Sequence, residues 1–113
     1  MEAKERKSLT TKEKKKLTKI FEQVLDADEM AKAAGLIENA SFMRIALREL
    51  QGDLQAYGYI ERYQNGENQS GLKDSSYLRA YNNLLKSYNT TMKQLLSLAP
   101  SARGDVDDGF DAL

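Results

Sequence analysis

The chain has 113 residues, with 17 Lys or Arg, 17 Asp or Glu, and neither Cys nor His. This length fits one domain, and the missing residue types exclude disulfides, thiolate metal sites and the usual general base. No signal peptide and no apolar run of about 20 residues is present, so we expect an intracellular protein that does not contact membranes.

The net charge of zero hides a gradient along the chain. Residues 1–20 hold eight Lys or Arg against three Glu, whereas residues 101–113 hold one Arg against four Asp. A basic beginning and an acidic end indicate two different partners, or contact with each other. The chain has no Gly-rich phosphate loop and no nucleophile beside a base, so we expect neither enzymatic activity nor a cofactor.

The first predicted element is an amphipathic helix that begins after Thr10. Thr10 and Glu13 have the spacing of a capping box, and apolar residues from Leu17 to Leu25 follow at helical spacing. We therefore expect residues 1–10 to form a flexible basic N-terminus and residues 11–100 to form a single helical domain.

Lys12, Lys15, Lys16 and Lys19 lie off the apolar stripe of this helix, and Lys14 belongs to the same cluster in the sequence. They have two interpretations: a solvated charged face, or a surface that contacts the phosphates of DNA. Their concentration within about two turns favours the second enough to make them the candidate DNA-binding residues.

The segment after this helix has two interpretations. Asp26 and Asp28 either cap a second helical piece that runs through Ala34 or only bend the first helix. In both cases we expect Gly35 to interrupt the helical pattern.

Two heptad stripes predict a long antiparallel helical hairpin from residues 36–57 and 78–99, within an all-α fold. The first stripe consists of Leu36, Ala40, Met43, Leu47, Leu50, Leu54 and Tyr57. The second consists of Leu78, Tyr81, Leu85, Tyr88, Met92, Leu95 and Ala99. Ser75 and its neighbours are candidate N-caps for the second helix, and Pro100 ends it. The stripes indicate core packing rather than a cofactor site.

The connector between these helices runs from Gly58 to Lys73 and has β-branched and aromatic character around Ile60. Asn65-Gly66 is a strong turn signal. A short β-hairpin or an ordered arch is therefore expected, either as a packed cap or as a binding tip.

Several apolar residues lie outside the two stripes. Phe42 and Ile45 occupy outer positions of the first helix and must face either the N-terminal helix or another subunit, and Leu84 and Leu96 flank the second stripe. These four residues are the candidate oligomer interface, and the surplus of apolar surface predicts a homo-oligomer.

Residues 101–113 are expected to be a disordered acidic tail. Asp107, Asp108, Phe110 and Leu113 are its candidate docking residues, since acidic side chains surround isolated apolar ones. The alternative is a tail that stays in solvent and binds no partner.

Three segments carry a resemblance to a known family: GLIENASFMRIALRELQGDL, YQNGENQSG and YNNLLKSYNTTMKQLLSLAP. Together they resemble the small subunit of tailed-phage terminases, in the group common among phages of Gram-positive bacteria. The resemblance covers residues from Leu17 to Arg103, and its most specific part is Tyr63 to Gln69 followed by the Tyr-Asn helix.

This resemblance implies a ring-forming regulatory adaptor of the DNA-packaging motor, located in the cytoplasm of the infected bacterial host. Such subunits recognise double-stranded viral DNA and pass it to the large subunit, which carries the ATPase and the nuclease. The family has no DNA-contact motif to transfer to single residues, so the lysine assignment rests on charge alone. The alternative function is a coiled-coil scaffolding or adaptor protein that binds no nucleic acid.

Overall fold

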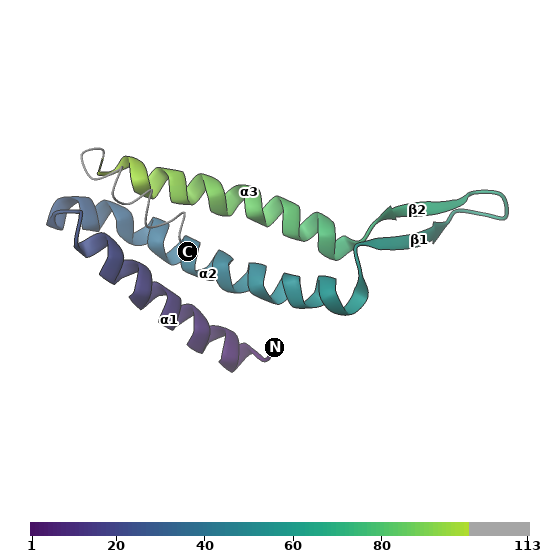
Figure 1. Ribbon diagram of the computed structural model, residues 1–113, viewed down its shortest axis with the longest axis horizontal. Coiled ribbons are helices and arrows are strands. Elements are labelled where there is room, and N and C mark those ends of the chain that lie inside the picture. The colour runs from purple at the N-terminus through teal and green to yellow at the C-terminus, as the bar shows by residue number, and fades with distance from the viewer. Residues whose placement is uncertain (100–113) are drawn as a thin grey trace.

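A computed structural model describes residues 1–99 as three helices and one β-hairpin (Figure 1). The elements are α1 (Ala3–Glu22), α2 (Ala27–Tyr57), β1 (Ile60–Gln64), β2 (Ser70–Asp74) and α3 (Ser76–Ser97). Helix α2 lies between α1 and α3 and packs against both. The mostly helical architecture predicted from the sequence is therefore confirmed, and the connector forms the short β-hairpin.

Helix α1 begins earlier than the sequence predicts. Its first residue is Ala3, and the Thr10 hydroxyl donates a hydrogen bond of 2.8 Å to the Arg6 carbonyl oxygen one turn back. Thr10 is thus an interior residue, and the prediction of an N-cap there is wrong, while residues 3–10 of the expected flexible N-terminus are helical. The first turns of α1 are held by Arg6, whose Nε and NH2 groups donate to the two carboxylate oxygens of Glu49 at 2.9 and 2.7 Å.

We expect Glu49→Gln to loosen the first two turns of α1 without unfolding the protein. The hydrogen bonds from Arg6 hold the pKa of Glu49 below its ordinary value. This ion pair therefore adds stability above that ordinary pKa, and the contribution is lost as the pH falls through the depressed one. Amide chemical shifts of residues 3–8 should move toward coil values in the variant, and in the wild type at acid pH. Glu38→Gln, at an exposed carboxylate of α2, is the control.

Helix α2 is a single helix of 31 residues that begins with a capping box. The Asp26 carboxylate accepts from the Glu29 backbone N–H at 2.8 Å, and the Glu29 carboxylate accepts from the Asp26 N–H at 2.9 Å. The expected interruption at Gly35 is wrong, since the helix passes through it. A glycine costs about 1 kcal/mol inside a helix, and burial of Ala33 and Ile37 on either side of it offsets this.

The main core gathers at the end of the bundle where all three helices meet. Leu17 and Phe21 of α1 pack there with Ile37 of α2 and Leu95 of α3. Beyond the N-terminus of α1, the α2–α3 pair continues alone. Leu54 remains buried there, as does Leu47 beside the first turns of α1, while the α3 residues of the seam are only half-buried.

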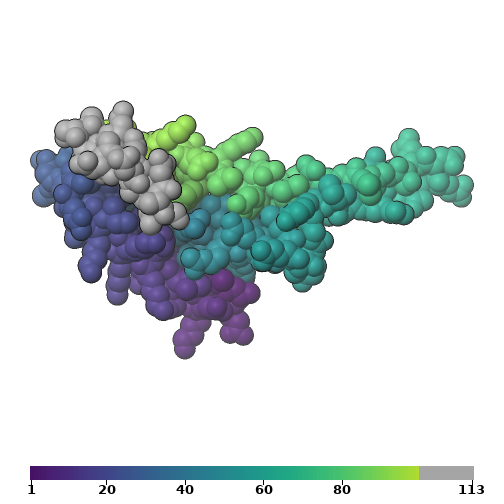
Figure 2. All heavy atoms as spheres, in the orientation of Figure 1, coloured from purple at the N-terminus to yellow at the C-terminus, as the bar shows by residue number. Residues whose placement is uncertain are grey.

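The β-hairpin projects beyond the helices as a narrow arm, which the space-filling view shows clearly (Figure 2). Its strands pair antiparallel with Arg62 opposite Leu72 and Tyr63 opposite Gly71. At its base the rings of Tyr57 and Tyr77 stack with centroids 5.3 Å apart. Ser75 caps α3 by accepting from the Leu78 N–H at 3.1 Å, as the sequence predicts.

Candidate nucleic-acid interface

The outer face of α1 carries the candidate DNA-binding lysines. All five are exposed, and Lys12, Lys15 and Lys19 recur every three or four residues on the side opposite Leu17 and Phe21. Lys15 lines one shallow depression with Lys19 and another with Lys12. Within residues 1–99 the ion pairs involve Met1, Arg6 and Lys73 as cations, so the charge of these five lysines is not neutralised there.

The lysine stripe has a length that suits a DNA strand. The rise from Lys12 to Lys19 is about 10 Å at 1.5 Å per residue. Duplex DNA carries one phosphate per about 3.4 Å of axis on each strand, so the stripe can face about three phosphates. Long lysine side chains on one rigid helix can follow such a row without any backbone rearrangement.

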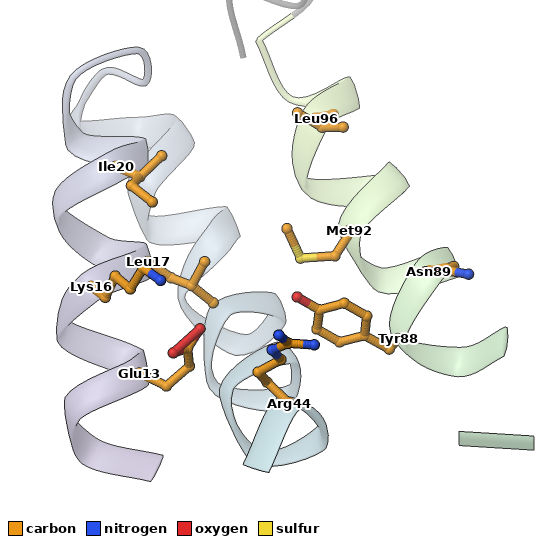
Figure 3. A pocket seen from close by; sticks show the side chains of 9 residues that line it. All are labelled: Glu13, Lys16, Leu17, Ile20, Arg44, Tyr88, Asn89, Met92 and Leu96. Carbon is orange, nitrogen blue, oxygen red and sulfur yellow. The ribbon is translucent and has the colours of Figure 1, made fainter. Parts of the chain in front are cut away.

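A groove between α1 and α3 is lined by Lys16 on its α1 side (Figure 3), and Lys16 also lines the outer depression with Lys15 and Lys19. The volume of the groove is about 310 Å³. Apolar side chains form much of its lining, and Lys16, Arg44 and Glu13 bring charge to it. Helical spacing places Lys14 and Lys16 on opposite sides of Lys15. The five lysines therefore do not form a single row along α1.

Tyr88 is a half-buried polar residue of this groove, as are Glu13 and Arg44. Burial raises the pKa of its phenol, partly opposed by the positive charge of Arg44. The phenol therefore stays protonated around neutral pH and offers the groove a hydroxyl donor beside a guanidinium. Residues 1–99 contain no cluster of three or more His, Cys, Asp or Glu side chains that could hold a metal ion.

The four predicted oligomer residues lie in different environments. Phe42 is 65% exposed, so its ring is available to a neighbour. Leu84 is half-buried, and Leu96 is a half-buried residue of the groove lining. Ile45 is only 3% exposed in the single chain, which assigns it to the intrachain core and removes it from the predicted oligomer interface.

The predicted docking residues Asp107, Asp108, Phe110 and Leu113 lie outside the described residues. The sequence does not reveal the exposure of the apolar side chains of the arm, above all that of Leu72. Residues 70–74 read SGLKD, with Leu72 as the single large apolar residue, so no periodic pattern marks it in the sequence.

No helix within residues 1–99 has the length and apolar character needed to cross a membrane. Comparisons with protein families, curated proteins and solved structures find no match for this chain.

Proposed function

We propose that this protein is a small terminase subunit, a regulatory adaptor that binds double-stranded viral DNA for packaging. It assembles into a homo-oligomeric ring in the cytoplasm of the infected bacterial host. It recruits the large subunit, which supplies the ATPase and nuclease activities, and is itself no enzyme.

The observation that carries the proposal is the unneutralised lysine stripe on the outer face of α1. A surface that only keeps a protein soluble mixes both signs of charge. Helix α1 instead carries eight Lys or Arg against three Glu, and the carboxylate of Glu49 is used by Arg6 at the far end of the helix. The sequence resemblance described above supports the identity of the DNA and of the second subunit.

The test is the salt dependence of binding to duplex DNA. We expect affinity to fall steeply with salt, because each neutralised phosphate contributes about 0.9 to the slope of log K against log salt concentration. Lys15→Glu with Lys19→Glu should lower this slope by about 1.8 per bound subunit. The loss should be similar for all duplex sequences, since phosphate contacts carry no sequence information.

The matched control is Lys86→Glu with Lys93→Glu, which makes the same charge change at exposed positions of α3. These substitutions should leave the slope close to that of the wild type. Equal losses in both double variants would show that net charge alone controls binding. An unchanged slope in the α1 variant would locate the contacts elsewhere, with Arg44 and Arg62 the next candidates.

A coiled-coil scaffolding or adaptor protein without nucleic-acid binding is the second candidate function. The exposure of Phe42 and of several apolar residues on the arm favours it, because such side chains suit protein contacts. This function predicts intact oligomers and no detectable DNA binding even at low salt.

A further inference from the structure

The projecting arm formed by β1 and β2 has two unlike faces. On one face Glu61 and Lys73 form an ion pair at 3.4 Å, and Lys73 lies 5.9 Å from the centre of the Tyr63 ring. That ring covers Gly71, where an added Cβ would meet it at 3.0 Å. This face is therefore satisfied within the arm itself.

The opposite face of the arm is not covered. Ile60 and Leu72 are on this face, and they are 52% and 69% exposed. An isolated two-stranded hairpin is marginally stable in water and needs further strands or a packed helix. Figures 1 and 2 show the arm extending away from the helices, so the single chain supplies neither.

The backbone edges of the arm are open as well. The ladder is bonded at the Tyr59–Ser75 and Asn65–Gln69 pairs, with Ser75 N–H donating to the Tyr59 carbonyl and Asn65 N–H to that of Gln69. Because bonded and non-bonded pairs alternate, the N–H and C=O groups of Arg62 and Leu72 point outward. Each edge thus offers three residues for strand addition: Ile60, Arg62 and Gln64 on β1, and Ser70, Leu72 and Asp74 on β2.

The charge of the arm indicates a protein partner rather than DNA. Between Gly58 and Ser75 there are two basic and three acidic residues, a net charge of −1. Phosphate contact requires a positive surface. Exposed Leu72 beside an open strand edge instead suits another β-strand.

The arms of two copies can pair in three ways, and only one fits. Pairing β1 with β1 places Arg62 opposite Arg62 of the second copy, where like charges repel. Antiparallel pairing of β1 with β2 puts both helical bodies at the same end, with arm centres about 10 Å apart. The cross-section of the molecule is 30 × 24 Å, so the bodies would collide.

Pairing β2 with β2 about a two-fold axis through Leu72 avoids both problems. Leu72 then lies opposite Leu72 of the second copy, and Ser70 lies opposite Asp74. The two helical bodies point away from each other, and the turn of each arm comes beside the base of the other, where Tyr57 and Tyr59 are exposed. The uncovered face becomes continuous across four strands.

We propose that two copies of this protein associate through the β2 edges of their arms, forming a four-stranded antiparallel sheet centred on Leu72. The contact rests on the arm alone and is independent of DNA binding and of a ring. It is isologous, so it closes on two copies and can join two larger assemblies but cannot build a ring by itself.

A proline substitution tests the pairing without breaking the hairpin. The Leu72 N–H points outward, so Leu72→Pro removes a donor from the β2 edge and leaves the β1–β2 bonds in place. Arg62→Pro makes the same change on the β1 edge and is the matched control. By light scattering, Leu72→Pro should halve the particle mass, whereas Arg62→Pro should leave it equal to that of the wild type. Equal effects of the two prolines would overturn the proposal.

A cysteine pair provides a second test that does not depend on the proline variants folding. The chain has no Cys, so Leu72→Cys introduces a single thiol. Directly opposed residues of a bonded pair have Cα atoms about 5.5 Å apart, within the range that a disulfide spans. Under mild oxidation Leu72→Cys should run mostly as a covalent dimer and Arg62→Cys as a monomer. No cross-linking at residue 72, or equal cross-linking at both positions, would contradict β2–β2 pairing.

Discussion

Replacing Phe21 by alanine is expected to lower the free energy of unfolding by about 3–5 kcal/mol. The Phe21 side chain is fully buried in the core where the three helices meet. Its removal leaves a cavity that the packed helices can fill only in part. Urea denaturation followed by circular dichroism, at low protein concentration, measures the change.

The matched control is Phe42→Ala, the same substitution at a residue that is 65% exposed. It should change the free energy of unfolding by less than about 0.5 kcal/mol, as exposed positions usually do. A small effect at Phe21 would show that α1 is not a stable part of the folded unit. A large effect at Phe42 would show that a neighbouring subunit covers this ring in solution.

Replacing Leu47 by alanine is expected to cost about 2–5 kcal/mol. Leu47 is 1% exposed on the α2 side of the α2–α3 seam, in the part of the pair that continues beyond the main core. Leu85→Ala on α3 is the comparison, and it should cost clearly less because the Leu85 side chain is half-buried. Thermal denaturation of both variants gives the difference, and equal losses would mean that a further chain covers Leu85.

Periodic patterns predicted the helical part of this fold well. Leu47 and Leu95 of the two stripes are buried and Ser75 caps α3 as its sequence neighbourhood indicates, whereas Tyr57, which the first stripe includes, is 68% exposed. The two errors, at Thr10 and Gly35, have one physical cause. Local signals for a helix end were outweighed by tertiary contacts: the Arg6–Glu49 ion pair beyond Thr10, and the burial of Ala33 and Ile37 around Gly35.

The candidate site was predictable only in part for a different reason. Lys12 to Lys19 stand out by composition, and a helical period places three of them on one face. Which lysine shares a groove with Arg44 depends on how α1 packs beside α3, and sequence spacing within one helix does not contain that information. The sequence also could not decide whether Ile45 faces the N-terminal helix or another subunit, because an apolar side chain suits both surfaces.

The concentration of the main core at one end of a molecule 62 Å long has a consequence for its local stability. Opening free energies vary within a protein, from near zero in exposed segments to the global value in the core. Amide hydrogens around Ile37 and Leu95 should exchange only through global unfolding, whereas those of β1 and β2 should exchange through local opening. The arm can therefore be ordered by a binding partner, or change in sequence during evolution, with little effect on the melting temperature of the helices.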